Sequence, residues 1–282
     1  MKYLQGLLSR KSILFLNKPL AFVYKDFINE TSYKFAFIIQ ILGIFFSALV
    51  FFFLSKLLGD SVSPYLKPYG GDYFSFVLIG IAFANYLQVS LSSFSSCIRN
   101  AQMLGTLEAL LVTQTEIPTI ILSSSIYSFV LTSFRVIIFL LFGILVLGLD
   151  IGEANFFGGI LVLLLTILSF SSIGIISASF IMVLKKGDPI NWIFTNLSWL
   201  LGGVYYPISV LPDWVQKFSY LLPITYSLEG MRMALLKGYT IRALLPNIIP
   251  LLIFTAVMLP VSMWVFKYAV KKAKIDGSLI KY

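Results

Sequence analysis

This chain contains few of the residues on which soluble enzymes depend. It has no histidine and a single cysteine, Cys97, which excludes histidine bases, histidine metal ligands, cysteine metal clusters and an intrachain disulfide. Only 12% of its residues are charged, whereas a soluble domain has about 25%. It contains no Gly-x-x-x-x-Gly-Lys-[Ser/Thr] loop and no His-Glu-x-x-His motif. We therefore expect it to bind no ATP through a P-loop and no catalytic zinc.

Long apolar runs dominate the chain instead. Hydrophobic residues make up 59% of it, and a run of about 20 apolar residues can cross a bilayer as a helix. We predict an all-α membrane protein with six transmembrane helices, at residues 35–54, 72–98, 117–149, 156–184, 190–206 and 244–266. Prolines and Glu229 interrupt the stretch 208–238, so we expect a re-entrant segment before the last span, with a simple extracellular loop as the alternative.

The two ends of the chain are more polar. Residues 19–30 place their apolar side chains on one helical face, which predicts an interfacial amphipathic helix, with a solvated helix packed on a partner as the alternative. The chain then divides into a cytoplasmic N-terminal arm (1–34), a six-span transmembrane domain (35–268) and a basic cytoplasmic tail (269–282). Fourteen of the 21 lysines and arginines fall on the side of both termini. The positive-inside rule therefore places both termini in the cytoplasm, and the protein in the cytoplasmic (inner) membrane.

A short segment, 103–113, lies between the second and third predicted spans. Leu104, Leu107, Leu110 and Leu111 share one helical face, and the segment is too short to cross a bilayer. We predict a helix at the cytoplasmic surface, which either docks into a groove of a partner protein or lies on the membrane.

Three predicted spans carry polar residues at helical spacing. Lipid-facing positions are rarely so polar, so these stripes predict a translocation pathway, with hydrogen bonding between helices as the alternative. The predicted pathway residues are Asn85, Gln88, Ser92, Arg135, Asn191, Thr195, Ser198 and Tyr205. Arg135 lies within a span, where a charge is costly and usually functional or paired. Glu229 is a candidate partner for it, and snorkelling towards an interface is the alternative.

Two stretches of sequence carry a resemblance to a known family. Segment 105–113, Gly-Thr-Leu-Glu-Ala-Leu-Leu-Val-Thr, resembles the coupling segment of ABC-2 type transporter permeases. Residues 202–212, Gly-Gly-Val-Tyr-Tyr-Pro-Ile-Ser-Val-Leu-Pro, followed by Leu-Pro-Ile-Thr-Tyr (222–226) and Glu-Gly-Met-Arg (229–232), are similar to the broken region before that family's last span. With the order of spans, the resemblance covers nearly the whole chain. Gln114 departs from it, at a position where many relatives have proline.

The resemblance implies a permease subunit of an ATP-driven exporter. Its cytoplasmic coupling helix would contact an ABC ATPase through Leu104, Gly105, Thr106, Leu107, Glu108 and Leu111. Its outer re-entrant cap would include Pro207, Pro212, Trp214, Pro223 and Glu229. The permease would bind no cofactor itself, whereas two copies of a separate ATPase subunit would bind ATP and Mg²⁺. A second copy, or a related permease, would complete the pathway in the lipid bilayer.

The resemblance also implies an amphipathic or lipid-linked substrate, such as a drug, lipid or glycan. In a membrane protein the net charge of +9 indicates orientation, so we expect no nucleic acid as a partner. An ion-coupled secondary transporter or flippase is the alternative, although it would need intramembrane acids and the spans contain few. A membrane-embedded transferase is a third hypothesis, for which the sequence shows no catalytic constellation.

Overall fold

The computed structural model describes residues 34–103, 105, 117–184 and 187–275. Every regular element in these residues is a helix, as the sequence predicts. The predicted interfacial helix at 19–30, most of segment 103–113 and the last residues of the basic tail lie outside the described residues.

Five long helices form the body of the molecule: α2 (Lys34–Leu58), α4 (Tyr73–Met103), α6 (Ile117–Leu147), α7 (Phe156–Leu184) and α11 (Ile241–Ile275). Among the described residues, four helices are long and apolar enough to cross a membrane, and they lie in α4, α6, α7 and α11. The first and fifth predicted spans stay predictions. The described apolar stretch of α2 is Phe45–Leu58, and α8 (Pro189–Leu201) has only 13 residues.

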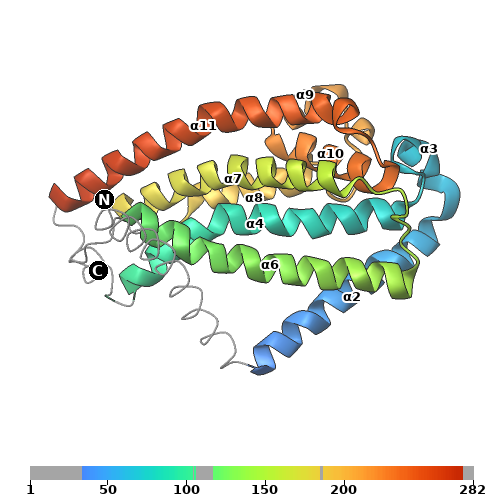
Figure 1. Cartoon of the computed structure of the whole chain (residues 1–282), viewed down its shortest axis with the longest axis horizontal. Coiled ribbons are helices and arrows are strands. Elements are labelled where there is room, and N and C mark those ends of the chain that lie inside the picture. The colour runs from blue at the N-terminus through green and yellow to red at the C-terminus, as the bar shows by residue number, and fades with distance from the viewer. Residues whose placement is uncertain (1–33, 104, 106–116, 185–186, 276–282) are drawn as a thin grey trace, which may run out of the picture.

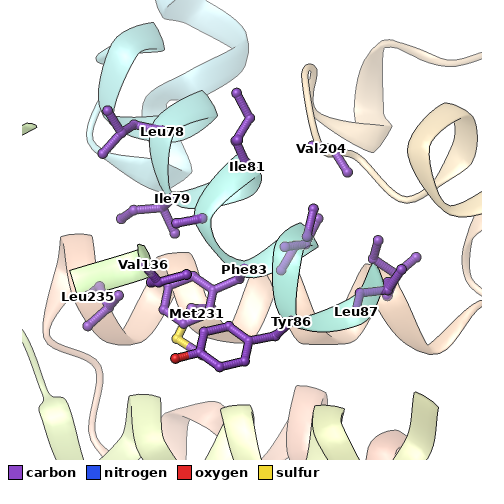
Figure 2. Packing of buried hydrophobic residues seen from close by; sticks show 14 of the residues in the cluster. Leu78, Ile79, Ile81, Phe83, Tyr86, Leu87, Val136, Val204, Met231 and Leu235 are labelled. Carbon is purple, nitrogen blue, oxygen red and sulfur yellow. The ribbon is translucent and has the colours of Figure 1, made fainter. Parts of the chain in front are cut away.

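The helices pack in a simple order. α4 and α7 lie side by side in the middle, α6 and then α2 follow beyond α4, and α11 covers the other side of α7 (Figure 1). Figure 2 shows the core where α4 contributes Leu78, Ile79 and Phe83, and α10 (Pro223–Lys237) contributes Met231 and Leu235. The core is therefore formed by side chains of the central helix α4 together with side chains of α10.

Small and polar residues bring α7 close to its neighbours. A β-carbon at Gly174 would lie 2.4 Å from the carbonyl oxygen of Ser90, so glycine permits α7 to touch the backbone of α4. The hydroxyl of Ser169 lies 2.7 Å from that of Thr255 in α11. Such contacts replace the hydrophobic effect as the cause of helix association inside a membrane.

Short helices cluster at one end of the molecule (Figure 1). η1 (Gly59–Val62), α3 (Ser63–Leu66) and η2 (Lys67–Tyr69) connect α2 to α4. η3 (Ile208–Val210), α9 (Asp213–Ser219) and α10 lie between α8 and α11. We call this the outer end, and the opposite end, where α4 stops at Met103 and α6 begins, the inner end. The stretch 208–238 is thus mostly helical, and its re-entrant position in a membrane stays a prediction.

Candidate functional site

A cavity of about 520 Å³ lies between α2, α4 and α6, closed on one side by residues at and beyond the end of α8. The residues that line it recur every three or four positions in each long helix, so each helix turns one face towards the same space. They are Gln40, Gly43, Ser47 and Phe51 of α2, Ile81, Asn85, Gln88 and Val89 of α4, Thr132, Arg135, Val136 and Phe139 of α6, and Trp199 and Tyr205.

Arg135 is the one charged residue among the described residues that line this cavity. One Nη of its guanidinium donates a hydrogen bond to Oε1 of Gln40, which connects α6 to α2. Arg135 lies about 18 Å from the outer end of α6, and Asn85 lies about 18 Å from the outer end of α4, at a rise of about 1.5 Å per residue. The two side chains are therefore at the same depth along the helix bundle, far from either end of their helices.

Aromatic side chains form the other wall. The ring of Tyr205 stacks on that of Phe51 with centroids 5.5 Å apart, and the Trp199 ring lies 5.4 Å from that of Tyr205. The cavity is therefore lined both by polar groups, which are amides, hydroxyls and one guanidinium, and by an apolar surface. Sites for amphipathic ligands combine the two in this way. The described lining holds no acid, cysteine or histidine that could serve as a general acid or base. The polar and aromatic side chains of the lining are of the kinds that bind a ligand.

Four predicted pathway residues meet in this cavity: Asn85, Gln88, Arg135 and Tyr205. The others lie elsewhere. The Ser92 hydroxyl donates to the Gln88 carbonyl oxygen at 2.8 Å, one turn nearer the inner end. Thr195 donates to the Asn191 side chain at 3.0 Å near the start of α8, and Ser198 is fully covered by its neighbours. The structure thus brings half of the predicted set together.

The sequence analysis missed the contribution of α2. Gln40, Gly43 and Ser47 lie on one face of that helix and line the cavity. A signal was present, because Gln40 is an isolated amide in a run of apolar residues. Trp199 gave no such signal, since aromatic residues are also common where a helix meets lipid.

A second polar centre lies at the outer end, around Arg232 of α10. Its side chain is only 3% exposed. Its Nε donates to the carbonyl oxygen of Phe76 at 3.0 Å, and its two Nη atoms donate to those of Gly203 and Val204 at 2.8 and 2.9 Å. Its guanidinium also covers the Phe76 ring, 3.4 Å from the centroid. Arg232 therefore ties α10 to the start of α4 and to the chain that follows α8.

Gly80 of α4 makes this arrangement possible. A β-carbon there would lie 2.4 Å from both the Arg232 Nη2 and the Val204 carbonyl oxygen. Gly203 adopts a φ of +75°, a left-handed conformation that favours glycine, in the turn that presents two of the three carbonyls. Two glycines thus shape the pocket that holds one arginine.

A smaller cavity of about 220 Å³ lies beside Arg232, lined among others by Tyr69, Tyr220 and Glu229. Glu229 is on α10, within electrostatic range of Arg232. The sequence made it a candidate partner for Arg135, but it does not line the cavity that contains Arg135. Burial, and then the nearby Glu229 charge, raise the pKa of the Tyr69 phenol to about 12, so it stays protonated. Among the described residues, no group of three acidic or cysteine side chains lies close enough together, here or elsewhere, to hold a metal ion.

The predicted cap residues all fall at the outer end. Pro207 and Pro212 directly precede η3 and α9, and Pro223 is the first residue of α10. Trp214 is exposed on α9. Proline suits these positions because a first helical turn needs no partner for its N–H groups. A cap role for them stays a prediction.

The predicted coupling residues cannot be placed in the same way. Leu104, Thr106, Leu107, Glu108 and Leu111 lie outside the described residues. Gly105 is described, and it forms a turn after α4 with a φ of +65°. The two helices that flank the segment, α4 and α6, both line the larger cavity.

Comparison with known proteins identifies the family. The model of the family described as ABC-2 type transporter matches residues 20–236. This chain belongs to that family. A search of curated proteins found no match. The protein is therefore a multi-pass membrane permease of the ABC transporter class, and the match extends from before α2 to the end of α10.

Proposed function

We propose that this permease is the transmembrane subunit of an exporter that moves an amphipathic or lipid-linked compound across the cytoplasmic membrane. The observation that carries the proposal is the cavity between α2, α4 and α6, in which Arg135 and amide side chains face an aromatic wall at mid-depth of the helix bundle. Polar groups at that depth are costly unless they serve binding or pairing. Family membership supports transport by an ABC-type complex.

In this proposal a separate ATPase supplies the energy, and this chain binds neither ATP nor Mg²⁺. Two copies of the permease, or this chain and a related one, enclose the pathway and bind two ATPase subunits. The segment 103–113 is the contact with the ATPase. Because it connects α4 to α6, a displacement of this segment moves two of the three long helices that line the cavity.

Orientation follows from charge. Lys267, Lys271 and Lys272 lie near the inner end of α11, so the positive-inside rule makes that end cytoplasmic. The outer end, with α9 and α10, then caps the pathway on the other side. An ion-coupled mechanism is disfavoured because the described cavity lining holds no acid to exchange a proton or bind a cation.

Co-purification tests the proposal. The tagged full chain is purified from its native membrane in mild detergent, and bound proteins are labelled with a photoreactive ATP analogue. We expect one labelled subunit in equal amount to the permease, and ATP hydrolysis by the purified complex. A chain that purifies intact and folded without any ATP-binding subunit would contradict the proposal.

A further inference from the structure

We propose that the larger cavity selects amphiphiles with an anionic head group, a phosphate or a carboxylate, and that Arg135 binds this group. The inference rests on the proposed function, because it assigns a substrate class to the same site. It adds a charge preference that neither the family match nor the apolar composition contains.

The charge of the cavity supports an anion. Arg135 is the one basic side chain among the described lining residues, and the others are neutral. A guanidinium presents N–H donors in a planar fork that matches phosphate and carboxylate oxygens. Its field is poorly screened in a space surrounded by apolar helices, so it attracts an anion and repels a cation more strongly than it would in water.

Neutral donors in the lining complement the charge. The side-chain amides of Gln40, Asn85 and Gln88 and the hydroxyl of Thr132 carry N–H or O–H groups. The Asn85 amide already donates to the Ile81 carbonyl oxygen at 2.9 Å, which holds its side chain against its own helix. The cavity therefore offers several donors around one cation, and the acceptor-rich group that such a set recognises is an oxyanion.

The aromatic wall supports an attached apolar chain rather than a free ion. Phe51, Phe139, Trp199 and Tyr205 occupy one part of the lining, with Tyr205 between Phe51 and Trp199. The cavity of about 520 Å³ is within the size range of sites for small organic ligands. A free phosphate would leave the aromatic wall unused, whereas an amphiphile covers both parts.

Fluorescence of Trp199 tests the inference directly, because this side chain lines the cavity. The other three tryptophans, Trp192, Trp214 and Trp264, are exposed and are replaced by phenylalanine. The full chain in phosphatidylcholine nanodiscs is titrated with chain-brominated dodecyl phosphate or dodecyltrimethylammonium, since bromine quenches a tryptophan that it contacts. We expect half-quenching at a concentration at least roughly tenfold lower for the phosphate, the effect of one charge-assisted contact.

Variants assign the preference to one residue. Arg135→Gln should remove the tenfold difference, Arg135→Lys should keep part of it, and Arg242→Gln, which removes an exposed charge at the outer end, should leave it unchanged. Unbrominated dodecyl phosphate should restore the fluorescence, and the same concentration of inorganic phosphate should not. If inorganic phosphate competes equally well, the site is one for free anions and the inference is wrong.

The remaining outcomes separate the inference from the proposed function. Equal half-quenching by both amphiphiles in the protein with Arg135 would overturn the charge preference but leave the cavity as a substrate site. A preference that persists in folded Arg135→Gln would also overturn it. If neither amphiphile quenches Trp199, the cavity does not receive such compounds, and the proposed pathway fails together with the inference. The comparison of two compounds on one protein needs only the variant with Trp199 as its single tryptophan to fold, and the three replaced tryptophans are all exposed.

Discussion

At the scale of single residues, two arginines inside the helix bundle have different environments. Arg232 is enclosed, and three backbone carbonyl oxygens and the Phe76 ring surround its guanidinium. Arg135 lines an open cavity, with Gln40 as its hydrogen-bond acceptor. A buried charge held by a complete set of acceptors fixes structure, whereas a charge that borders a ligand-sized space can also contact a substrate.

The sequence distinguished these two arginines only in part. Arg135 stood out because it interrupts an apolar run. Arg232 entered only as part of the stretch 229–232 that resembles the family, because the carbonyls that bind it come from residues 76, 203 and 204, far away in the sequence. Sequence patterns report which groups need a partner, but not which distant backbone groups converge to supply one.

The Arg232 site makes a prediction about Gly80. Gly80→Ala should destabilise the protein by about 1–3 kcal/mol, because the new methyl group overlaps the Arg232 guanidinium and the Val204 carbonyl. The matched control is Gly43→Ala in α2, where no atom lies within 4 Å of the new β-carbon. That change should be neutral or stabilising by up to about 1 kcal/mol. Melting temperatures in detergent compare them, and an equal loss for both would contradict the steric account.

At the scale of elements, apolar runs predicted the helices but not all of their ends. α7 begins and ends where the sequence placed it. α4 continues to Met103 and α11 to Ile275, because the charged residues that end an apolar run are themselves good helix formers. α8 stops at Leu201, five residues before the predicted end. A β-carbon at Gly202 would contact Ile224, and Gly203 leaves the helical conformation.

Helical periodicity likewise identified polar faces but not their neighbours. Asn85 and Gln88 have a space to face because residues of α2, α4 and α6 line one cavity there. Serine hydroxyls such as that of Ser92 bond to a carbonyl of their own helix, so they need no polar neighbour and report little about the pathway. Long amides and charges are therefore better indicators of a polar cavity than serine or threonine.

The coupling segment gives a prediction at this scale. Leu107→Asp should weaken binding of the ATPase by roughly tenfold or more, because a charge would replace an apolar anchor of the helix that the sequence predicts at 103–113. Leu221→Asp, at an exposed leucine of the outer end, is the matched control and should not affect binding. ATP hydrolysis and the amount of co-purified ATPase are the two measurements. A Leu107→Asp complex with normal values of both would show that the segment has another role.

At the scale of the whole molecule, the two ends differ in structure. Short helices and the buried Arg232 occupy the outer end, whereas the described part of the inner end consists of the ends of the long helices and the start of α8 (Figure 1). A transporter that opens and closes needs one end that can move relative to the other. We infer that the tied outer end acts as the cap and that the inner ends of α4 and α6 follow the ATPase.

This orientation can be tested in cells. With Cys97 replaced by serine, a cysteine at Tyr65 should react with a membrane-impermeant maleimide on intact cells, since Tyr65 is exposed at the outer end. A cysteine at Met103, exposed at the inner end, should react only after the membrane is permeabilised. The reverse pattern would invert the molecule in the membrane and place segment 103–113 out of reach of ATP.

The most direct test of the whole account asks whether the cavity between α2, α4 and α6 is the transport pathway. In the reconstituted complex with its ATPase and without Cys97, a cysteine at Gln88 should react with a polar thiol reagent. Its rate should change several-fold between the nucleotide-free and the vanadate-trapped states. A cysteine at Phe134, at similar depth on α6 but exposed away from the cavity, should react slowly in both states. Equal rates at the two positions, or a Gln88 cysteine that is indifferent to nucleotide, would contradict the account.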